Sequence, residues 1–299
     1  MEHGPPNMTG APTTEYPGYG SDNSTENTES SSGGLDFDDW MRILILLLAP
    51  LGLLGNGAVL WLLGFRVQRT PFSVYILNLA MADALFLCSA FLFSIHAFWG
   101  YIFNLLTLKI LSFLTFMSYN AGLSLLAAIS TERCLSALFP LWYRCHRPKH
   151  TSAAVCAGIW ALAGMIGLVP FVFWDYLSMP CTNLVIFQFV YFLLLTCVLC
   201  VSSLTLLLKV QCSSQRQRPP RLYLLVLLAV LAFLLCGLPL GIWAVLFLYF
   251  HIDLIPHWLY EPLACVNSSV NPLIYFFVGR LGHKRREPLR LVLQRALRD

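Results

Sequence analysis

Charged residues are scarce in this sequence. Asp, Glu, Lys and Arg make up 11% of its 299 residues, whereas a soluble domain carries about 25%. Because 58% of the residues are hydrophobic, a water-soluble fold is excluded. No nucleic-acid-binding motif accompanies the formal net charge of +4, so we expect no nucleic-acid partner.

Long apolar runs stand where the charges are missing. A bilayer core about 30 Å thick needs about 20 apolar residues per helix. Lipid offers no partners for backbone N–H and C=O groups, and the runs lack the alternation of barrel strands. We therefore predict an all-α, seven-transmembrane helix bundle at residues 40–279. The predicted spans cover residues 41–65, 72–98, 105–138, 151–174, 182–209, 222–250 and 258–279.

The few basic residues indicate how the chain is oriented. All but two of the 19 Lys and Arg lie at or after the ends of the first, third and fifth spans or beyond residue 279; the exceptions are Arg42 and Lys109. The positive-inside rule then places the N-terminus outside the cell and the C-terminus in the cytoplasm, as in a multi-pass protein of the plasma membrane. Residues 1–39 are rich in Ser, Thr, Gly and Pro, and we expect a disordered extracellular tail glycosylated at Asn7 and Asn23.

One acid lies about midway along the second span. An ionisable group inside a membrane helix is costly and usually marks function. Asp83 would need amide donors or a cation, and Asn56 and Asn271 are the expected partners. Three interpretations remain open: a structural polar cluster, a site for a sodium ion, and a proton-linked switch. We expect no other cofactor.

Two motifs stand at the cytoplasmic ends of the third and seventh spans. The first is the pair Glu132 and Arg133, in which the acid could hold the Arg at rest, although an Arg that reaches toward the headgroups is the simpler interpretation of that pair alone. The second runs from Asn271 to Tyr275, where Pro272 permits a kink. These residues, with Pro239 in the sixth span, are the predicted residues of an activation switch that frees the Arg133 guanidinium for a partner protein.

The motifs together resemble those of the rhodopsin-like receptors. The resemblance rests on the Glu-Arg pair, the Asn-Pro-x-x-Tyr run, Asn56 in Gly-Asn-Gly, Asp83 in Asn-Leu-Ala-Met-Ala-Asp, and Trp160. Longer runs are similar to the Mas-related receptors: Trp61 to Arg66, Gly122 to Ser136, Pro140 to His150, Phe233 to Pro239 and Asn271 to Gly279. The resemblance implies a receptor that passes extracellular ligand binding to a heterotrimeric G protein. A non-signalling decoy receptor and a transporter are the alternatives. We expect no enzymatic activity, since no nucleophile or metal cluster lies at membrane depth.

The sequence also departs from common receptor patterns. Gly237 stands where many rhodopsin-like receptors have Trp, although Pro239 still permits a bend. Thr115 stands where receptors for monoamines have Asp, and Cys265 where opsins have their retinal Lys, so neither ligand is favoured. Cys181 is the one cysteine in a predicted extracellular connection, so we predict no extracellular disulfide.

The outer ends of the spans combine acids with aromatic residues. An acid in an aromatic setting suits a cationic ligand, and we expect a peptide or small cationic molecule to bind through Glu261. Two alternatives stay open: Glu261 could pair with Lys109, and the tryptophans could be interface anchors. The further candidate ligand contacts are Asp175, Thr115, Tyr119, Trp243 and Trp258.

Residues 280–299 form the expected cytoplasmic tail. Its apolar residues recur at helical spacing among Arg residues, which predicts a short amphipathic helix on the inner leaflet. The tail contains no Ser or Thr. We therefore expect weak arrestin recruitment, with Ser213 and Ser214 of the third inner connection as substitute phosphorylation sites.

Overall fold

The computed structural model describes Met1 and residues 36–66, 70–100, 102–148, 150–173, 182–212, 221–247, 252, 254–280 and 288–296. The chain divides into two units, Met1–Leu35 and Asp36–Asp299, and the helices belong to the second. Several sequence predictions fall outside the described residues. They concern Asn7, Asn23, Asp175, Cys181, Ser213 and Ser214.

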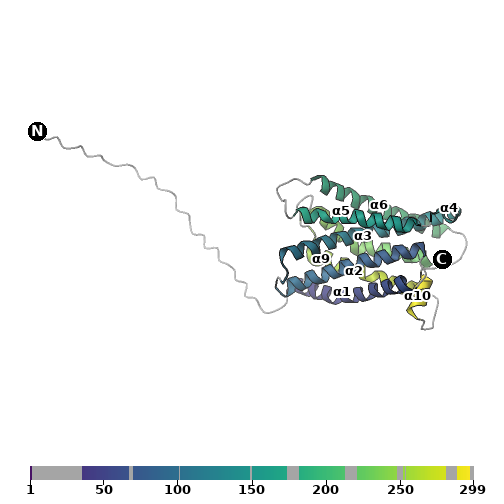
Figure 1. Ribbon diagram of the computed structural model, residues 1–299, viewed down its shortest axis with the longest axis horizontal. Coiled ribbons are helices and arrows are strands. Elements are labelled where there is room, and N and C mark those ends of the chain that lie inside the picture. Colours follow the sequence, from purple (N-terminus) through teal and green to yellow (C-terminus); the bar gives the residue numbers. More distant parts are fainter. Residues whose placement is uncertain are drawn as a thin grey trace. The chain divides into compact units, whose positions relative to one another are not determined.

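The described part of the chain is built from helices and contains no strand, which confirms the predicted all-α class (Figure 1). Neighbouring helices run side by side and form one bundle, with the short α4 and α10 at the same end. The elements are α1 (Phe37–Trp61), η1 (Leu62–Arg66), α2 (Pro71–Phe98), α3 (Leu105–Leu138), α4 (Pro140–His146), α5 (Thr151–Phe173), α6 (Thr182–Cys212), α7 (Arg221–Ala232), η2 (Phe233–Gly237), α8 (Leu238–Val245), α9 (His257–Arg280) and α10 (Leu289–Ala296).

Side-chain caps fix where two of the long helices begin. Thr70 accepts a hydrogen bond from the backbone N–H of Ser73 at 3.1 Å, and the Ser73 hydroxyl accepts one from the Thr70 N–H at 2.8 Å. Pro71 follows at the first helical position, where its missing N–H costs nothing. Asn104 caps α3 in the same way, because its side-chain oxygen accepts from the Thr107 N–H at 2.9 Å.

The predicted sixth span is interrupted in the middle. It consists of α7, the π-helical turn η2 and α8, with Pro239 in the first turn of α8. Proline lacks the N–H that an α-helix needs and crowds the preceding turn, and π-helical turns are frequent at functional sites. The span is therefore bent within its apolar run.

The helix α3 lies at the centre of the bundle, where it packs against α2, α5, α6 and α7. α9 packs against α1, α2, α7, α8 and α10. Apolar side chains also cover the outside: Leu47, Leu51 and Leu54 of α1 are 63%, 68% and 77% exposed. Such a surface suits lipid rather than water.

Six helices of the described chain are long and apolar enough to cross a membrane. α9 is the seventh long segment of the bundle, and it carries the polar residues Glu261, Asn267 and Asn271.

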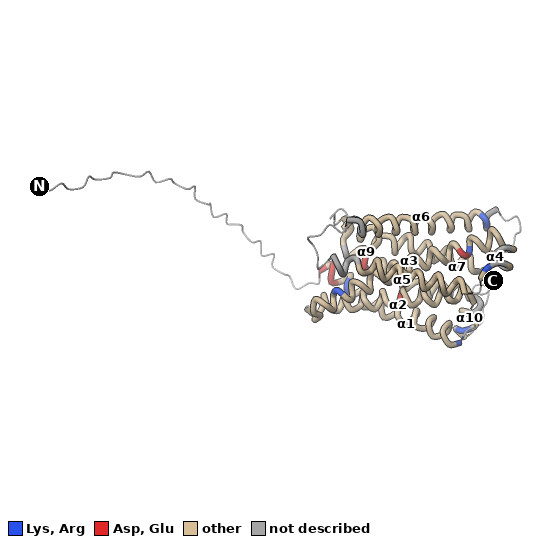
Figure 2. The backbone as a smooth tube through the Cα atoms, turned by 45° about the horizontal axis from the view of Figure 1, so that its top comes forward, with Lys and Arg blue, Asp and Glu red and all other residues tan. Residues whose placement is uncertain are grey.

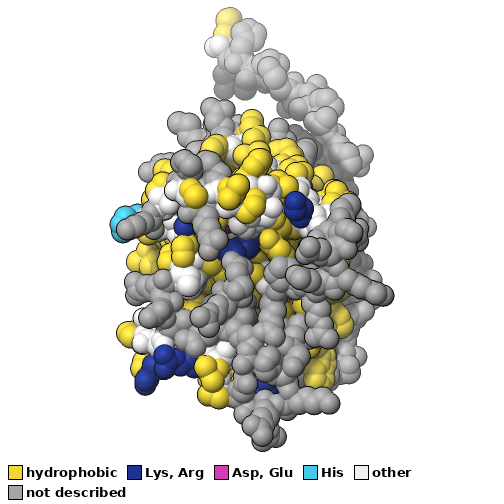
Figure 3. Space-filling view, turned by 90° about the vertical axis from the view of Figure 1, so that its right-hand side faces the viewer, with side chains coloured by type: hydrophobic (Ala, Val, Ile, Leu, Met, Phe, Trp, Pro, Cys, Tyr) yellow, Lys and Arg dark blue, Asp and Glu magenta, His cyan; other side chains and the backbone are white. Residues whose placement is uncertain are grey.

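Most of the described acids lie at the end where α1 begins, whereas most Lys and Arg lie at the opposite end (Figure 2). Figure 3 looks onto that opposite end, where basic and apolar side chains lie next to each other.

The amphipathic helix predicted within residues 280–299 is present as α10. Its residues Val292 and Leu293 are buried, and α10 packs against α9 and α7. Leu289 and Leu291 remain 53% and 46% exposed. One set of apolar residues of α10 thus packs against the bundle, and another set forms an exposed apolar surface.

Candidate functional site

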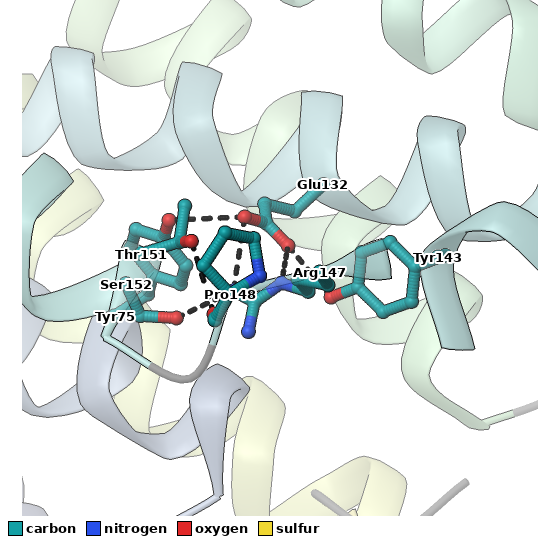
Figure 4. A network of polar contacts seen from close by, with 7 residues as sticks. All are labelled: Tyr75, Glu132, Tyr143, Arg147, Pro148, Thr151 and Ser152. Carbon is teal, nitrogen blue, oxygen red and sulfur yellow. Dashed lines mark hydrogen bonds and ion pairs between the residues drawn. The ribbon is translucent and has the colours of Figure 1, made fainter. Parts of the chain in front are cut away.

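A polar network lies at the end of α3 near α4, with the Glu132 carboxylate at its centre (Figure 4). The Arg147 guanidinium donates to both carboxylate oxygens, at 3.1 and 3.2 Å. Tyr75 of α2 and Tyr143 of α4 donate their hydroxyls at 3.1 and 2.6 Å. Arg147 also donates to Ser152 of α5 at 2.6 Å. The Glu132 carboxylate therefore ties α2, α3 and α4 together, and Arg147 extends the network to the start of α5.

The two partners in this ion pair are nearly buried, with side-chain exposures of 10% for Arg147 and 14% for Glu132. Burial, together with the neighbouring Glu132 carboxylate, raises the pKa of Tyr143 to about 12. The phenol thus keeps its proton and remains a donor to the carboxylate. A two-pronged, charge-assisted pair of this kind is among the stronger polar contacts in proteins.

The neighbouring Arg133 has different surroundings. It is 5% exposed, and its guanidinium carbon lies 4.3 Å from the ring centre of Phe72. We expected Glu132 to restrain Arg133, but in the part of the chain that the structure describes the cation paired with Glu132 is Arg147. The physical reason is geometric, because adjacent residues on a helix do not face each other.

A second polar centre lies halfway along the bundle. Asn271 of α9 donates to the Asp83 carboxylate at 2.7 Å, which joins α9 to α2. Asn56 donates instead to two backbone carbonyls, those of Gly52 and Ser268, both at 3.0 Å. The hydrogen bonds of the described residues thus give Asp83 one of its two expected amide partners, while the other joins α1 to α9.

A small cavity of about 20 Å³ adjoins Asp83. That volume suffices for one water-sized species. Its lining includes Ser118, Asn267 and Ser268, and the buried Oδ1 atoms of Asn267 and Asn271 have no hydrogen-bond partner. A carboxylate with hydroxyl and amide oxygens is a fitting donor set for a hard cation. No group of three or more His, Cys, Asp or Glu suited to a transition metal occurs among the described residues.

A larger cavity of about 300 Å³ opens toward the end of the bundle where α1 begins. It is lined mainly by apolar and aromatic side chains, and this size and lining are typical of small-molecule sites. Four of the predicted ligand contacts lie in its wall, namely Thr115, Tyr119, Trp243 and Glu261. The candidate ligand contacts predicted on α3, α8 and α9 therefore line one common cavity.

The aromatic wall is well defined. Trp243 of α8 stacks on Tyr260 of α9, with ring centres 4.4 Å apart. Thr115 donates to Ser89 at 2.9 Å, so its hydroxyl links α3 to α2. Trp258, the fifth described candidate, is not in the cavity lining; it packs edge-on against Phe37 of α1 at 5.0 Å.

One hydrogen bond connects this cavity to the interrupted span. The Tyr119 hydroxyl donates to the backbone carbonyl of Gly237 at 3.0 Å. Neither glycine beside this bond has room for a side chain, because a Cβ at Gly237 would lie 2.6 Å from the Phe233 ring and a Cβ at Gly241 would lie 2.5 Å from the Tyr119 oxygen. Tyr119 of α3 therefore bonds directly to the backbone at the junction of η2 and α8.

Sequence reasoning missed several residues of the cavity. Arg42, His96, Asn120 and Gln188 all contribute to its lining. Gln188 was the easiest to find, because an amide within a long uncharged run marks function by the same logic as an acid does. Every cysteine whose side chain the structure describes is a free thiol.

A helical bundle with an apolar surface, a cavity at one end and a polar network at the other is the arrangement expected of a seven-transmembrane receptor. Residues 55–275 match the family described as 7 transmembrane receptor (rhodopsin family). The chain is 44% identical over 270 residues to rat Mas-related G-protein coupled receptor member A, covering 86% of this chain and 89% of that protein. It is 45% identical over 270 residues to the human member X1, covering 87% and 83%. It is 46% identical over 278 residues to the rhesus macaque member X2, covering 86% and 82%.

The chain belongs to the rhodopsin family of seven-transmembrane receptors and, within it, to the Mas-related G-protein-coupled receptors. It is therefore a multi-pass membrane receptor, and its family is a receptor family rather than an enzyme family. Membership confirms the predicted resemblance, and it implies an extracellular ligand and a G-protein partner.

Proposed function

We propose that this receptor passes the binding of a peptide or small cationic molecule in the 300 Å³ cavity to a heterotrimeric G protein at the end near Glu132 and Arg133. The hydrogen bond between Tyr119 and Gly237 carries the proposal. It joins the cavity wall to the bent sixth span, so a ligand that displaces Tyr119 acts on that bend. Movement of α7 relative to α3 then changes the surroundings of Arg133.

A cationic ligand is supported by the chemistry of the cavity. Glu261 lines it together with the stacked rings of Trp243 and Tyr260. A carboxylate attracts a cation through charge, and aromatic faces attract it through their quadrupoles. Arg42 lines the same cavity, which favours a ligand that also carries an acceptor or an anionic group. A peptide supplies both kinds of group.

The orientation of the chain belongs to the same proposal. The basic end of the bundle faces the cytoplasm, and the acidic end with the 300 Å³ cavity faces the outside of the plasma membrane. The support is the uneven distribution of charge in Figure 2 together with the positive-inside rule.

A sodium ion at Asp83 is part of the proposal as well. The neighbouring cavity of about 20 Å³ and the unpartnered Oδ1 atoms of Asn267 and Asn271 support it. The ion would be held by the Asp83 carboxylate with hydroxyl and amide oxygens around it, and it would supply a positive charge between α2 and α9. The chain's own Asn271 already donates to the same carboxylate.

The proposal is tested by measuring G-protein activation in cells, without ligand and with a panel of basic peptides and amines. Arg133→Ala is expected to abolish the signal, because it removes the guanidinium at the coupling end. Glu261→Gln is expected to lower only the response to cations. Unchanged potency of Glu261→Gln at normal surface expression would contradict the cationic site. No signal from the wild-type chain at equal surface expression would favour a decoy receptor.

We expect arrestin recruitment to be weak, because residues 280–299 contain no Ser or Thr. Ser213 and Ser214 would then carry whatever phosphorylation supports it. A proximity assay between receptor and arrestin, with the Ser213→Ala, Ser214→Ala double variant as comparison, measures this. Strong recruitment that survives the double substitution would contradict the expectation.

A further inference from the structure

Gln188 is an unusual residue for its place in the bundle. It lies on α6 within a long uncharged run, it is 6% exposed, and it lines the 300 Å³ cavity. Its side-chain oxygen is buried without a hydrogen-bond partner. A buried polar atom without a hydrogen-bond partner lowers the stability of the fold, so a purely structural role does not account for Gln188.

The orientation of Gln188 follows from its helix. Phe187 and Val190 on the same helix are 49% and 55% exposed and face outward. Phe192 lies one turn further on the face of Gln188, is 6% exposed and lines the same cavity. The amide therefore points into the bundle rather than toward lipid.

A second amide faces the same cavity from α3. Asn120 is 3% exposed, and its NH2 group donates to the Phe116 carbonyl at 2.8 Å. Phe192 continues the wall from this polar region toward the bent span, because a Cβ at Gly241 would clash with its ring. The polar region thus borders the part of the cavity that contacts α8.

We propose that Gln188, together with Asn120, forms a polar subsite of the 300 Å³ cavity that accepts a hydrogen bond from an N–H or O–H group of an aromatic ligand. The inference rests on the proposed receptor function and specifies its ligand class. The apolar body of the ligand packs between Phe116 and Phe192, and its donor is satisfied by the Gln188 oxygen. Glu261 lines another part of the same cavity, so recognition at the subsite does not require a charge.

Uncharged fragments test the subsite without involving Glu261. The purified full-length receptor is titrated with two matched pairs: indole with 1-methylindole, and 4-ethylphenol with 4-ethylanisole. In each pair a methyl group caps the donor. We expect the donor-bearing member to bind the wild-type receptor about fivefold more tightly, the factor given by one net hydrogen bond. Equal affinity within both pairs, or no binding of any fragment, would overturn the proposal.

Substitutions separate the hydrogen bond from simple crowding by the methyl group. In Gln188→Leu the affinity ratio within each pair is expected to fall to about one, while Gln188→Glu, which keeps an acceptor, retains a ratio above one. Val190→Leu, on the outward face of the same helix, keeps the wild-type ratio. A ratio that persists in Gln188→Leu would contradict the assignment. Gln188→Met serves in the same way if the Leu variant fails to fold.

Thermal unfolding gives an independent readout. Because the Gln188 oxygen lacks a partner in the empty receptor, Gln188→Leu is expected to unfold at the same or a higher temperature than the wild type. If Gln188 had a structural role instead, Gln188→Leu would unfold at a lower temperature than the wild type. Fragment binding needs no G protein, so the two proposals can fail separately. If the donor-bearing fragments bind more tightly but the cells give no G-protein signal, only the proposed function is overturned. If the cells give a signal but the fragments of each pair bind equally, only the subsite is overturned.

Discussion

Glu132 and Arg133 are neighbours in sequence, but their side chains leave the helix in different directions. Glu132 pairs with Arg147, whereas Arg133 lies over the Phe72 ring. The sequence identified both residues as important without indicating which cation the carboxylate would meet. That pairing depends on where the segment after α4 returns to the bundle, and no local pattern encodes it.

Tyr119 provides the clearest prediction at the scale of a residue. Tyr119→Phe removes the donor to the Gly237 carbonyl and leaves a buried acceptor unpaired. We expect a loss of about 1–3 kcal/mol of stability and a rise in ligand-independent G-protein activation, because the junction of η2 and α8 is released from α3. Thermal unfolding and a cellular activation assay measure the two effects.

A matched control is available on α6. Tyr191 and Ser124 share a hydrogen bond of 2.5 Å that joins α6 to α3. Tyr191→Phe makes the same chemical change and also removes one contact of α3, but it does not touch the bent span. It is expected to lower stability without raising basal activation. Equal basal activation in both variants would contradict the role given to Tyr119.

Asp83 gives a prediction about ions. If sodium binds beside it, NaCl should stabilise the purified receptor more than the same concentration of KCl does, by about 1.4 kcal/mol at a tenfold excess over the dissociation constant. Asp83→Asn is expected to abolish the difference. Asn56→Ala, which loses the bonds to Gly52 and Ser268, should be less stable but still sensitive to sodium. A sodium effect that survives Asp83→Asn would rule out this site.

At the scale of an element, the break in the sixth span depends on the absence of a side chain. Gly237→Ala would place a Cβ 2.6 Å from Phe233 and 3.2 Å from Asn267. We expect a loss of about 1–3 kcal/mol from overpacking and altered G-protein activation. Gly158→Ala on α5 is the control, because a Cβ there meets nothing within 4 Å. Equal stability and equal G-protein activation in the two variants would show that η2 tolerates a side chain at position 237.

The sequence predicted the helices better than it predicted the contacts between them. Long uncharged runs were enough to predict the helical bundle, since length and hydropathy decide which segments cross a membrane. Pro239 indicated a bend in the sixth span, and η2 lies next to it. The contact of Tyr119 with Gly237 joins positions 118 residues apart, and only the folded bundle, in which α3 lies beside the sixth span, brings them together.

At the scale of the whole molecule, the orientation can be measured directly. A tag at the N-terminus is expected to bind antibody on intact cells, and a C-terminal tag only after permeabilisation. Removal of N-linked glycans should lower the apparent mass of the wild type, and it should leave the Asn7→Gln, Asn23→Gln double variant unchanged. Staining of the C-terminal tag on intact cells would contradict the orientation.

The cavity at one end and the ion pair at the other are linked by few polar groups. Between them lie Asp83, Asn271 and the buried hydroxyl of Tyr275. The sequence indicated Asp83 and its partner Asn271 through the cost of placing an acid in a membrane, and it indicated Tyr275 through the Asn-Pro-x-x-Tyr motif. It could not indicate Gln188 as a subsite, because an amide in an apolar run does not reveal whether its partner is the protein itself or a ligand.

The π-helical turn η2 can convert to α-helix only by a shift of a whole residue. A π turn holds one residue more than an α turn, so its conversion to α-helix would advance the register of everything before it by one position. One position corresponds to a rotation of about 100° about the helix axis. α7 would then present a different face to α3, and intermediate rotations would leave backbone groups unpaired. A receptor built on such a turn would switch between discrete states, and partial agonists would change the time spent in each state rather than create a halfway conformation.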